Sequence, residues 1–107
     1  MQYIERYNLK PGKAGAYREW LQKHEEMLAK EGPEGWKYLG TWFTVRGFGP
    51  HECETRWELP DYSALGAGFG SEALQAAWAE IMDWFETAQY GATLMKSAAE
   101  VLIQKGA

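Results

Sequence analysis

Apolar residues recur at two different spacings along the chain, and the changes of spacing mark the first elements. In residues 2–9 (QYIERYNL) aromatic and aliphatic residues recur at multiples of two positions, which is typical of a β-strand. From residue 14 to about residue 31 the apolar residues instead form one helical stripe, with charged residues outside it. The run Gly32-Pro33-Glu34-Gly35 ends this helix, because glycine and proline do not continue one.

The middle of the chain predicts a β-hairpin, and the remainder predicts a helix followed by a strand. Two segments rich in β-forming residues, about 36–46 and 51–59, are joined by the short turn Gly47-Phe48-Gly49-Pro50, so they should pair antiparallel. Ser71 is a typical N-cap for a second helix, which its apolar stripe carries to about residue 88. Residues 93–101 (TLMKSAAEV) then predict the last strand.

The predicted order, βαββαβ, is that of an α+β ferredoxin-like domain with four antiparallel strands and both helices on one face. A chain of 107 residues fits one such domain, spanning residues 1–107. Its six Trp, six Tyr and four Phe exceed what so small a core needs, since each aromatic side chain can bury about 150–250 Å². We therefore expect a second copy to cover the open face of the sheet as a homodimer, or a ligand pocket to take up the surplus.

Charge and cysteine content argue against several classes of partner. Lys and Arg number 11 against 15 Asp and Glu, with no basic run, which argues against nucleic acid as a partner. The single cysteine, Cys53, excludes an internal disulfide and suits a reducing compartment. No apolar segment reaches the length of a membrane span, and the first residues lack the features of a signal peptide. These patterns predict a soluble, cytoplasmic protein with no membrane partner.

Two short segments resemble a known group of proteins. The opening Tyr3–Lys13 (YIERYNLKPGK) resembles the first strand and turn of NIPSNAP-like proteins, and Arg56–Tyr62 (RWELPDY) resembles a Trp-bearing strand end of the same superfamily. The resemblance implies the dimeric α/β-barrel fold over nearly the whole chain. That superfamily includes cofactor-free monooxygenases of the antibiotic-biosynthesis-monooxygenase type, isomerases and heme-using enzymes, so the resemblance does not imply one function.

Heme is a specific case within this resemblance. Heme-degrading enzymes of the superfamily place an Asn on the first strand, a Trp on the third and an iron-binding His on the second helix. Trp57 falls at the Trp position, whereas Glu5 stands at or near the Asn position and Trp78 at or near the His position. Because the iron ligand is among the missing residues, we expect no heme degradation by that route. His24 remains as an alternative ligand.

Two further motifs, residues 51–54 and the glycine-rich run 66–71, resemble metal-binding and phosphate-binding sequences, but both are better explained without a bound group. His51 and Cys53 point to one side of their strand and the neighbouring glutamates to the other, so four ligands cannot converge on a metal ion. Cys53 is expected to be a small core thiol. The glycine-rich run 66–71 precedes a helix but lacks a phosphate-binding lysine, and it is expected to form a flexible lip of the pocket. We therefore predict no metal and no cofactor.

Alternation along the hairpin gives its two faces different roles. The side predicted to lie beneath the helices is aromatic and nearly uncharged. Its candidate site residues are Tyr38, Gly40, Trp42, Thr55 and Trp57. The other side is assigned to the second copy and carries Glu54, Arg56 and Glu58. Gly40 lacks a side chain between bulky neighbours, which predicts either a hollow for a ligand or a β-bulge.

Two ionisable residues are candidates for acid/base chemistry. Glu5 shares its strand face with Tyr3 and Tyr7, and a carboxylate among aromatic residues is costly to bury and tends to have a raised pKa. His24 lies seven residues after Tyr17 on the inward stripe of the first helix, where an imidazole titrates near neutrality. The alternatives are a structural pair for Glu5 and, for His24, a neutral imidazole bonded to a backbone carbonyl.

These observations predict a cofactor-independent enzyme of monooxygenase, isomerase or lyase type. Its substrate would be a small apolar or aromatic molecule held between the sheet and the helices. Glu5 and His24 would transfer protons in one aromatic hollow. The walls would be Tyr7, Tyr38, Trp42, Trp57 and Trp78, with Gly40 and Thr55 beside them. The alternative is a non-catalytic ligand-binding or structural dimer in which the same residues form the core.

Overall fold

The computed structural model describes residues 1–47 and 49–100. Within this part of the chain the strands are β1 (Gln2–Leu9), β2 (Lys37–Phe43), β3 (Cys53–Glu58) and β4 (Phe85–Met95). The α-helices are α1 (Ala14–Glu31), α2 (Leu65–Phe69) and α3 (Glu72–Ile81), and 3₁₀ turns occupy Tyr62–Ala64 and Met82–Trp84. None of these helices combines the length and the apolar character needed to cross a membrane. The predicted first strand and first helix have the expected bounds.

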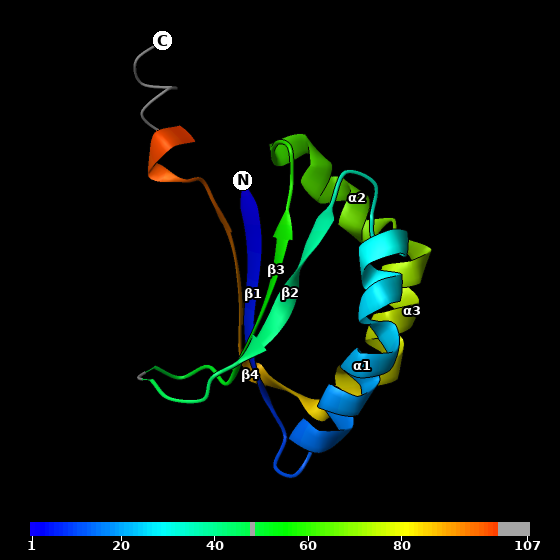
Figure 1. The fold of residues 1–107 in the computed structure, drawn as a ribbon, viewed down its shortest axis with the longest axis vertical. Coiled ribbons are helices and arrows are strands. Elements are labelled where there is room, and N and C mark those ends of the chain that lie inside the picture. Colours follow the sequence, from blue (N-terminus) through cyan, green and yellow to red (C-terminus); the bar gives the residue numbers. More distant parts are fainter. Residues whose placement is uncertain (48, 101–107) are drawn as a thin grey trace.

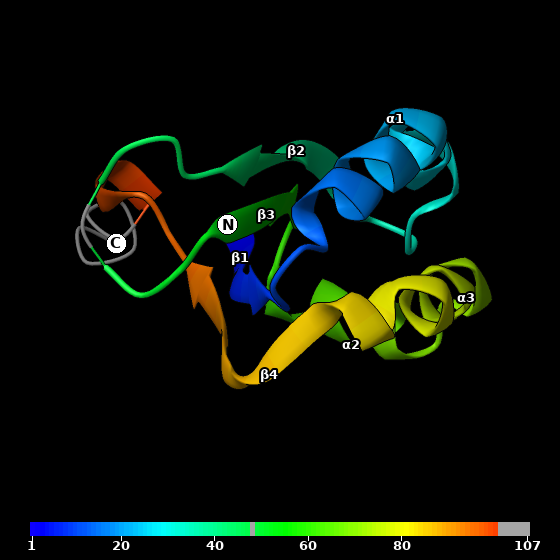
Figure 2. The same ribbon diagram turned by 90° about the horizontal axis from the view of Figure 1, so that it is seen from below.

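The four strands form one antiparallel sheet in the order β2-β3-β1-β4. Because β3 pairs antiparallel with both β1 and β2, those two strands run in the same direction on either side of it, which is the split βαβ unit of the ferredoxin-like fold. Figure 1 shows the three helices on one side of the sheet, and Figure 2 shows the two layers from below. The predicted α+β fold with its helices on one face is confirmed.

The boundary between the second helix and the last strand differs from the prediction. Ser71 caps α3 as expected, because its hydroxyl accepts a hydrogen bond of 3.2 Å from the Leu74 backbone N–H. The helix ends at Ile81 rather than near residue 88, and a 3₁₀ turn leads directly into β4. Phe85 continues the apolar spacing of the helix, but its buried ring belongs to the first residue of the strand. The last strand is therefore residues 85–95, and Val101 of the predicted strand lies outside the described residues.

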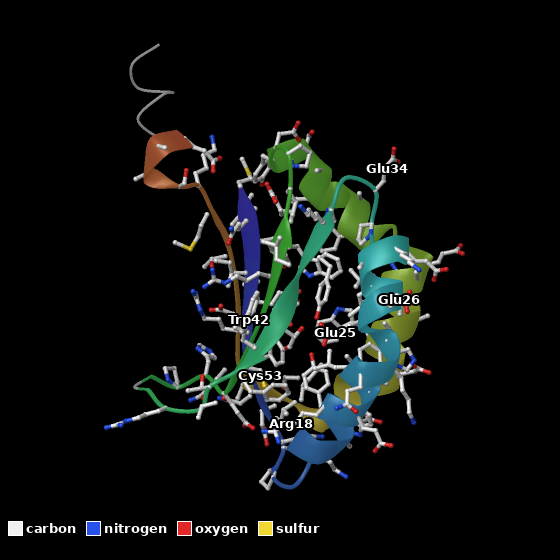
Figure 3. All side chains as sticks on the ribbon, viewed as in Figure 1. Arg18, Glu25, Glu26, Glu34, Trp42 and Cys53 are labelled. Atoms are coloured by element: carbon white, nitrogen blue, oxygen red, sulfur yellow. The ribbon has the colours of Figure 1, made fainter. Side chains whose placement is uncertain are left out.

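A β-bulge in β2 reverses the side to which the rest of that strand points. Tyr38 pairs with Trp57, but the next pair is Gly40 with Arg56, so one extra residue is inserted between them. Gly40 has φ +131°, a backbone conformation that favours glycine. Trp42 (Figure 3) consequently lies on the sheet face away from the helices and is 49% exposed. The Arg56 guanidinium lies over its ring. The predicted positions of Gly40 and Trp42 beneath the helices are wrong, and the bulge alternative describes Gly40.

The core lies between the sheet and the helices and is largely aromatic. Tyr17 on α1 packs edge-on against Tyr7 of β1 and Phe85 of β4, with ring centroids 6.1 and 5.1 Å apart. Trp57 and Leu59 belong to the same core cluster and are almost completely buried. Edge-on ring pairs of this kind contribute about 0.5–1.5 kcal/mol each beyond the area they bury. Aromatic packing thus joins the two layers and places β1 at the centre of the domain.

Candidate functional site

Glu5 lies in the middle of β1 with its carboxylate directed into the aromatic core. It stands opposite Thr55 of β3 and Ala92 of β4, and it is only 8% exposed. The indole N–H of Trp57 donates to Oε1 at 3.3 Å, and the hydroxyl of Tyr90 donates to Oε2 at 2.5 Å. Burial raises the pKa of the Glu5 carboxyl, and this effect exceeds the opposing effect of the two hydrogen bonds. None of the ion pairs in the described residues includes Glu5.

A cavity of about 380 Å³ opens onto this carboxylate. Its walls come from β1, β4, α2 and α3, together with the residue that precedes β2. Five aromatic residues line it, namely Tyr3, Trp36, Phe69, Trp78 and Tyr90. The remaining lining is mostly Leu, Ala and Met, and Gln75 adds one amide. Its volume falls within the range of sites for small molecules, and its lining is mainly apolar with a few polar groups, as such sites usually are.

The short helix α2 forms one rim of this cavity through Leu65, Gly68 and Phe69. The run predicted to be a flexible lip thus lies at the expected place, but most of it is helical. Gly68 is buried, and a Cβ atom there would lie 2.5 Å from the ring of Trp36. That ring is held in place because its N–H donates to the Ala64 carbonyl at 2.7 Å. Only glycine at position 68 therefore lets α2 approach Trp36 closely enough to form this wall.

A second, smaller cavity of about 40 Å³ is also lined by Glu5 and lies next to the core. Carboxylate and hydroxyl groups line it from Glu5, Tyr7, Tyr17, Thr41 and Thr55. Tyr17 Oη and Tyr7 Oη are hydrogen-bonded at 2.7 Å, and Tyr7 Oη and Thr55 Oγ1 at 2.6 Å. Burial raises the pKa of Tyr17 to about 12 and that of Tyr7 further still, so both phenols stay neutral.

The same row of hydroxyl groups continues outward to the protein surface. Thr55 Oγ1 bonds Thr41 Oγ1 at 2.9 Å, and Thr41 Oγ1 bonds Tyr38 Oη at 2.6 Å. Tyr38 then donates to the exposed carboxylate of Glu25, which α1 presents on the side facing β2 (Figure 3). Every buried polar side-chain atom in the described residues has a hydrogen-bond partner. The hydroxyl row, from Tyr17 to Glu25, thereby satisfies the polar groups that the core encloses.

The structure brings together most, but not all, of the predicted site residues. Those that line one or both cavities are Glu5, Tyr7, Thr55, Trp57 and Trp78. Tyr38 lines neither cavity, although its ring packs against Trp57 at a centroid distance of 5.1 Å. Gly40 and Trp42 lie outside both cavities because the bulge turns them to the opposite face. The site therefore lies over β1 and β4 rather than over the hairpin.

His24 does not share the hollow with Glu5. Its imidazole stacks on the ring of Trp20 at a centroid distance of 4.3 Å, and its Nδ1 is 2.7 Å from the Trp20 carbonyl oxygen. Its Nε2 lies 3.9 Å from the carboxylate of Glu80 on α3. His24 lines neither cavity, so the predicted pairing with Glu5 is wrong. The alternative, an imidazole bonded to a backbone carbonyl, describes its position.

Sequence reasoning missed Tyr90, the residue with the shortest contact to Glu5. The second helix was predicted to continue to about residue 88, so the start of the strand that carries Tyr90 was assigned to a helix instead. In β4 the register with β1 shifts between the pairs Arg6–Gly91 and Asn8–Glu86, so four residues of β4 oppose one residue of β1. Tyr90 belongs to this bulge. The sequence did contain one signal for this strand, because Tyr90, Ala92 and Leu94 recur at every second position.

Other reactive side chains, those of Cys53 and His51, lie away from the two cavities that Glu5 lines. Burial raises the pKa of the Cys53 thiol to about 12, so the thiolate that a nucleophile needs is not formed near neutrality. His51 Nε2 is 2.6 Å from the backbone oxygen of Gln89, so its imidazole is engaged with β4 rather than with the thiol of Cys53. Among residues 1–47 and 49–100, no cluster of three or more His, Cys, Asp or Glu is arranged to hold a metal ion.

Comparison with solved structures finds this architecture in proteins of similar length. The Agrobacterium tumefaciens protein Atu4242 superimposes with a TM-score of 0.65 and 21% identity, covering 92% of this chain and 94% of its own. An uncharacterized NIPSNAP domain protein from Burkholderia xenovorans gives a TM-score of 0.66 at 18% identity, covering 91% and 94%. Rv0793 from Mycobacterium tuberculosis gives 0.64 at 19% identity, covering 91% and 96%.

These likenesses establish the fold. The resemblance seen in the two short sequence segments is confirmed at that level, since a NIPSNAP domain protein shares the architecture over nearly all of both chains. No protein-family model matches the chain, and no curated protein sequence matches it either. Fold alone does not specify an activity.

Proposed function

We propose that this protein is an enzyme that transfers a proton on a small, mainly apolar or aromatic molecule bound in the 380 Å³ cavity, with Glu5 as the acid/base group. The observation that carries the proposal is a buried carboxylate, without a cationic partner in the described residues, at the wall of an aromatic cavity. Strongly perturbed ionisable groups in clefts are characteristic of functional sites. Isomerase or lyase chemistry fits best, because moving a proton between carbon and a carboxylate needs no cofactor.

The surroundings of Glu5 suit a general acid/base. Burial moves the pKa of the carboxyl upward, toward the range in which one group both takes and returns a proton near neutrality. Burial and the charge of Glu5 raise the pKa of Tyr90, so its hydroxyl remains a neutral donor. The two donors on Trp57 and Tyr90 hold both carboxylate oxygens in place. A fixed base above an apolar cavity wall needs little reorganisation when the substrate binds.

Exchange of carbon-bound protons for deuterium tests the proposal whatever the final product of the reaction is. A panel of small aromatic ketones and enones is incubated in D₂O with the protein, and loss of the α-proton signal is followed by ¹H NMR. Replacing a general base typically costs about 10²–10⁴-fold in rate, so Glu5→Gln should abolish any exchange that the wild type catalyses. Glu58→Gln, at an exposed position on β3, is the matched control and should leave the rate unchanged. Equal rates for wild type and Glu5→Gln would refute the role of Glu5.

A non-catalytic ligand-binding role is the second candidate. It is favoured by one observation, that neither cavity is lined by a histidine, lysine or arginine from the described residues that would act as a second acid/base group. Binding of panel members, monitored by tryptophan fluorescence, with no exchange in any of them would support this role over catalysis. Exchange catalysed by the wild type would exclude it.

We further propose that two copies pair through the sheet face that the helices leave open. Two large apolar residues on this face, Trp42 and Met95, are 49% and 50% exposed. Glu54 on the same face is bound within the chain by Arg6 at 2.9 Å and Arg56 at 2.6 Å, so its charge is already compensated. Light scattering on the wild type should give the mass of a dimer, and Trp42→Glu should give a monomer. Tyr62→Glu, at an exposed aromatic residue outside the sheet, should remain dimeric. A monomeric wild type would refute the pairing.

A further inference from the structure

The cavity carries a single formally charged side chain. Glu5 is the one Asp, Glu, Lys, Arg or His among its lining residues in the described part of the chain. The nearest residue in sequence with a positive charge, Arg6, points to the opposite face of the sheet because successive side chains of a strand alternate, and there it binds Glu54. The described part of the protein therefore supplies no cation that compensates the Glu5 carboxylate inside the cavity.

An ionised carboxylate in such a position is costly unless something neutralises it. Its two hydrogen-bond donors, Trp57 and Tyr90, are neutral groups and spread its charge only in part. Buried charges in proteins are either paired or lose their charge by binding a proton. In the empty cavity the proton is the available partner. In the occupied cavity the ligand itself can take that role.

The aromatic walls favour the same kind of ligand. Tyr3 and Trp36 meet at a centroid distance of 5.3 Å and an angle of 59°, and Trp78 and Tyr90 meet at 6.1 Å and 75°. All four of these residues line the cavity, so aromatic rings form much of its wall. Ring faces carry negative electrostatic potential and attract cations, most strongly in the case of tryptophan. Two tryptophans and two tyrosines therefore surround the same space as the carboxylate.

From these two observations we propose that the cavity selects a small organic cation, a substituted ammonium group carried on an apolar or aromatic body, with the nitrogen beside Glu5. The proposal refines the substrate class of the site described under Proposed function and rests on that site. Binding would exchange the proton of Glu5 for the ligand's charge and release that proton to solvent. The carboxylate would then be ionised, and thus able to act as a base, only when the correct substrate is present.

A pair of probes that differ only in charge tests this directly. Choline and 3,3-dimethyl-1-butanol have nearly the same shape, but the first carries a quaternary nitrogen where the second carries a carbon. Both are titrated into the protein, and tryptophan fluorescence reports binding because Trp36 and Trp78 line the cavity. Cation–π contacts of desolvated rings alone reach about 2 kcal/mol, so choline should bind at least about tenfold more tightly.

Variants and pH then identify the residue responsible. Glu5→Gln should reduce the preference for choline to the part that the aromatic rings supply and leave the affinity for the alcohol within about twofold, whereas Glu58→Gln should keep the full preference. In the wild type, the affinity for choline should increase as the pH rises and Glu5 loses its proton, while the affinity for the alcohol stays constant. This second measurement does not depend on the folding of a variant.

The possible results separate this inference from the proposed function. Equal affinities, or tighter binding of the alcohol, would overturn the cation preference and leave a site for neutral apolar molecules in place. A choline preference that is as large in Glu5→Gln as in the wild type would overturn the role of Glu5 in it. Binding of neither probe would overturn the cation proposal, whereas the deuterium-exchange experiment would still decide whether the cavity acts on neutral compounds.

Discussion

The hydroxyl row gives a prediction whose magnitudes can be worked out bond by bond. Tyr17→Phe removes one hydrogen bond and leaves Tyr7 with Thr55 as its partner. Thr55→Val removes two bonds, but Tyr7 keeps Tyr17 and Thr41 keeps Tyr38. Tyr7→Phe also removes two bonds and leaves the buried Tyr17 hydroxyl without the partner it has in the structure.

A buried hydrogen bond contributes about 0.5–1.5 kcal/mol net, and an orphaned buried polar group costs about 1–3 kcal/mol. The expected losses in free energy of unfolding are therefore about 1 kcal/mol for Tyr17→Phe, about 2 kcal/mol for Thr55→Val and about 3–4 kcal/mol for Tyr7→Phe. The Tyr7→Phe/Thr55→Val double variant should lose about 1 kcal/mol less than the sum, because both single changes remove the same bond.

Urea unfolding at one fixed protein concentration measures these differences, since pairing of copies would make the midpoint depend on concentration. The urea midpoint should be lowered least by Tyr17→Phe, more by Thr55→Val and most by Tyr7→Phe. The dependence of the free energy of unfolding on urea concentration should not change. Each substitution keeps the shape of the side chain nearly constant, so cavity formation does not obscure the effect. A loss for Tyr17→Phe as large as that for Tyr7→Phe, or no loss for Thr55→Val, would refute the connected row.

Two other predictions concern the pKa of Glu5 and the β2 bulge. Because burial raises the Glu5 pKa above its ordinary value of 4.5, the folded state binds this proton more tightly than the unfolded state. Wild-type stability should therefore fall relative to Glu5→Gln as the pH rises from about 4.5 through the folded pKa of Glu5. Calorimetry at a series of pH values measures this, and a stability difference that does not change with pH would contradict it. Gly40→Ala should destabilise the protein by about 1–3 kcal/mol, because φ is +131° there and the new Cβ would lie 3.2 Å from the Trp42 ring. Gly15→Ala is the control, since Gly15 lies within α1 with open space around it. This variant should stabilise the protein by about 0.5–1 kcal/mol in the same assay.

The sequence alone was enough to predict the bounds of those elements whose apolar spacing fits only one type of secondary structure. Residues 2–9 and 14–31 have a clear spacing and are followed by residues that interrupt it, so both bounds were predicted correctly. The junction after Ile81 could not be predicted in the same way. Phe85 stands four residues later and extends the helical spacing, while the packing that draws it into the sheet comes from distant residues of β1 and α1.

The candidate site was predictable where it depends on alternation within an unbroken strand. Glu5 and Trp57 lie on strands without a bulge between them, and both point into the core as expected. Trp42 follows a bulge, and a single inserted residue exchanges the two faces of everything after it. Alternation predicts which residues of a strand share a face. Which of the two faces that is depends on how the strand pairs with its neighbours, and a bulge changes it partway along the strand.

His24 illustrates a different limit. A helical stripe has a width, and residues at its margin face a neighbouring helix rather than the sheet. Trp20 is buried, but His24 stacks against its ring and turns toward Glu80 of α3. The spacing of apolar residues in α1 identifies the inward stripe, and it does not specify which neighbour each margin residue meets.

The two bulges also have a consequence for how this molecule meets other chains. They lie on β2 and β4, which are the two edge strands of the sheet. Edge strands expose unpaired backbone groups that invite another strand to join, and irregular edges prevent such a strand from keeping its register. Both borders of the sheet are therefore poor templates for open-ended growth into fibres. The features that turn Trp42 outward and bring Tyr90 to Glu5 thus also protect the protein from aggregation through its edges.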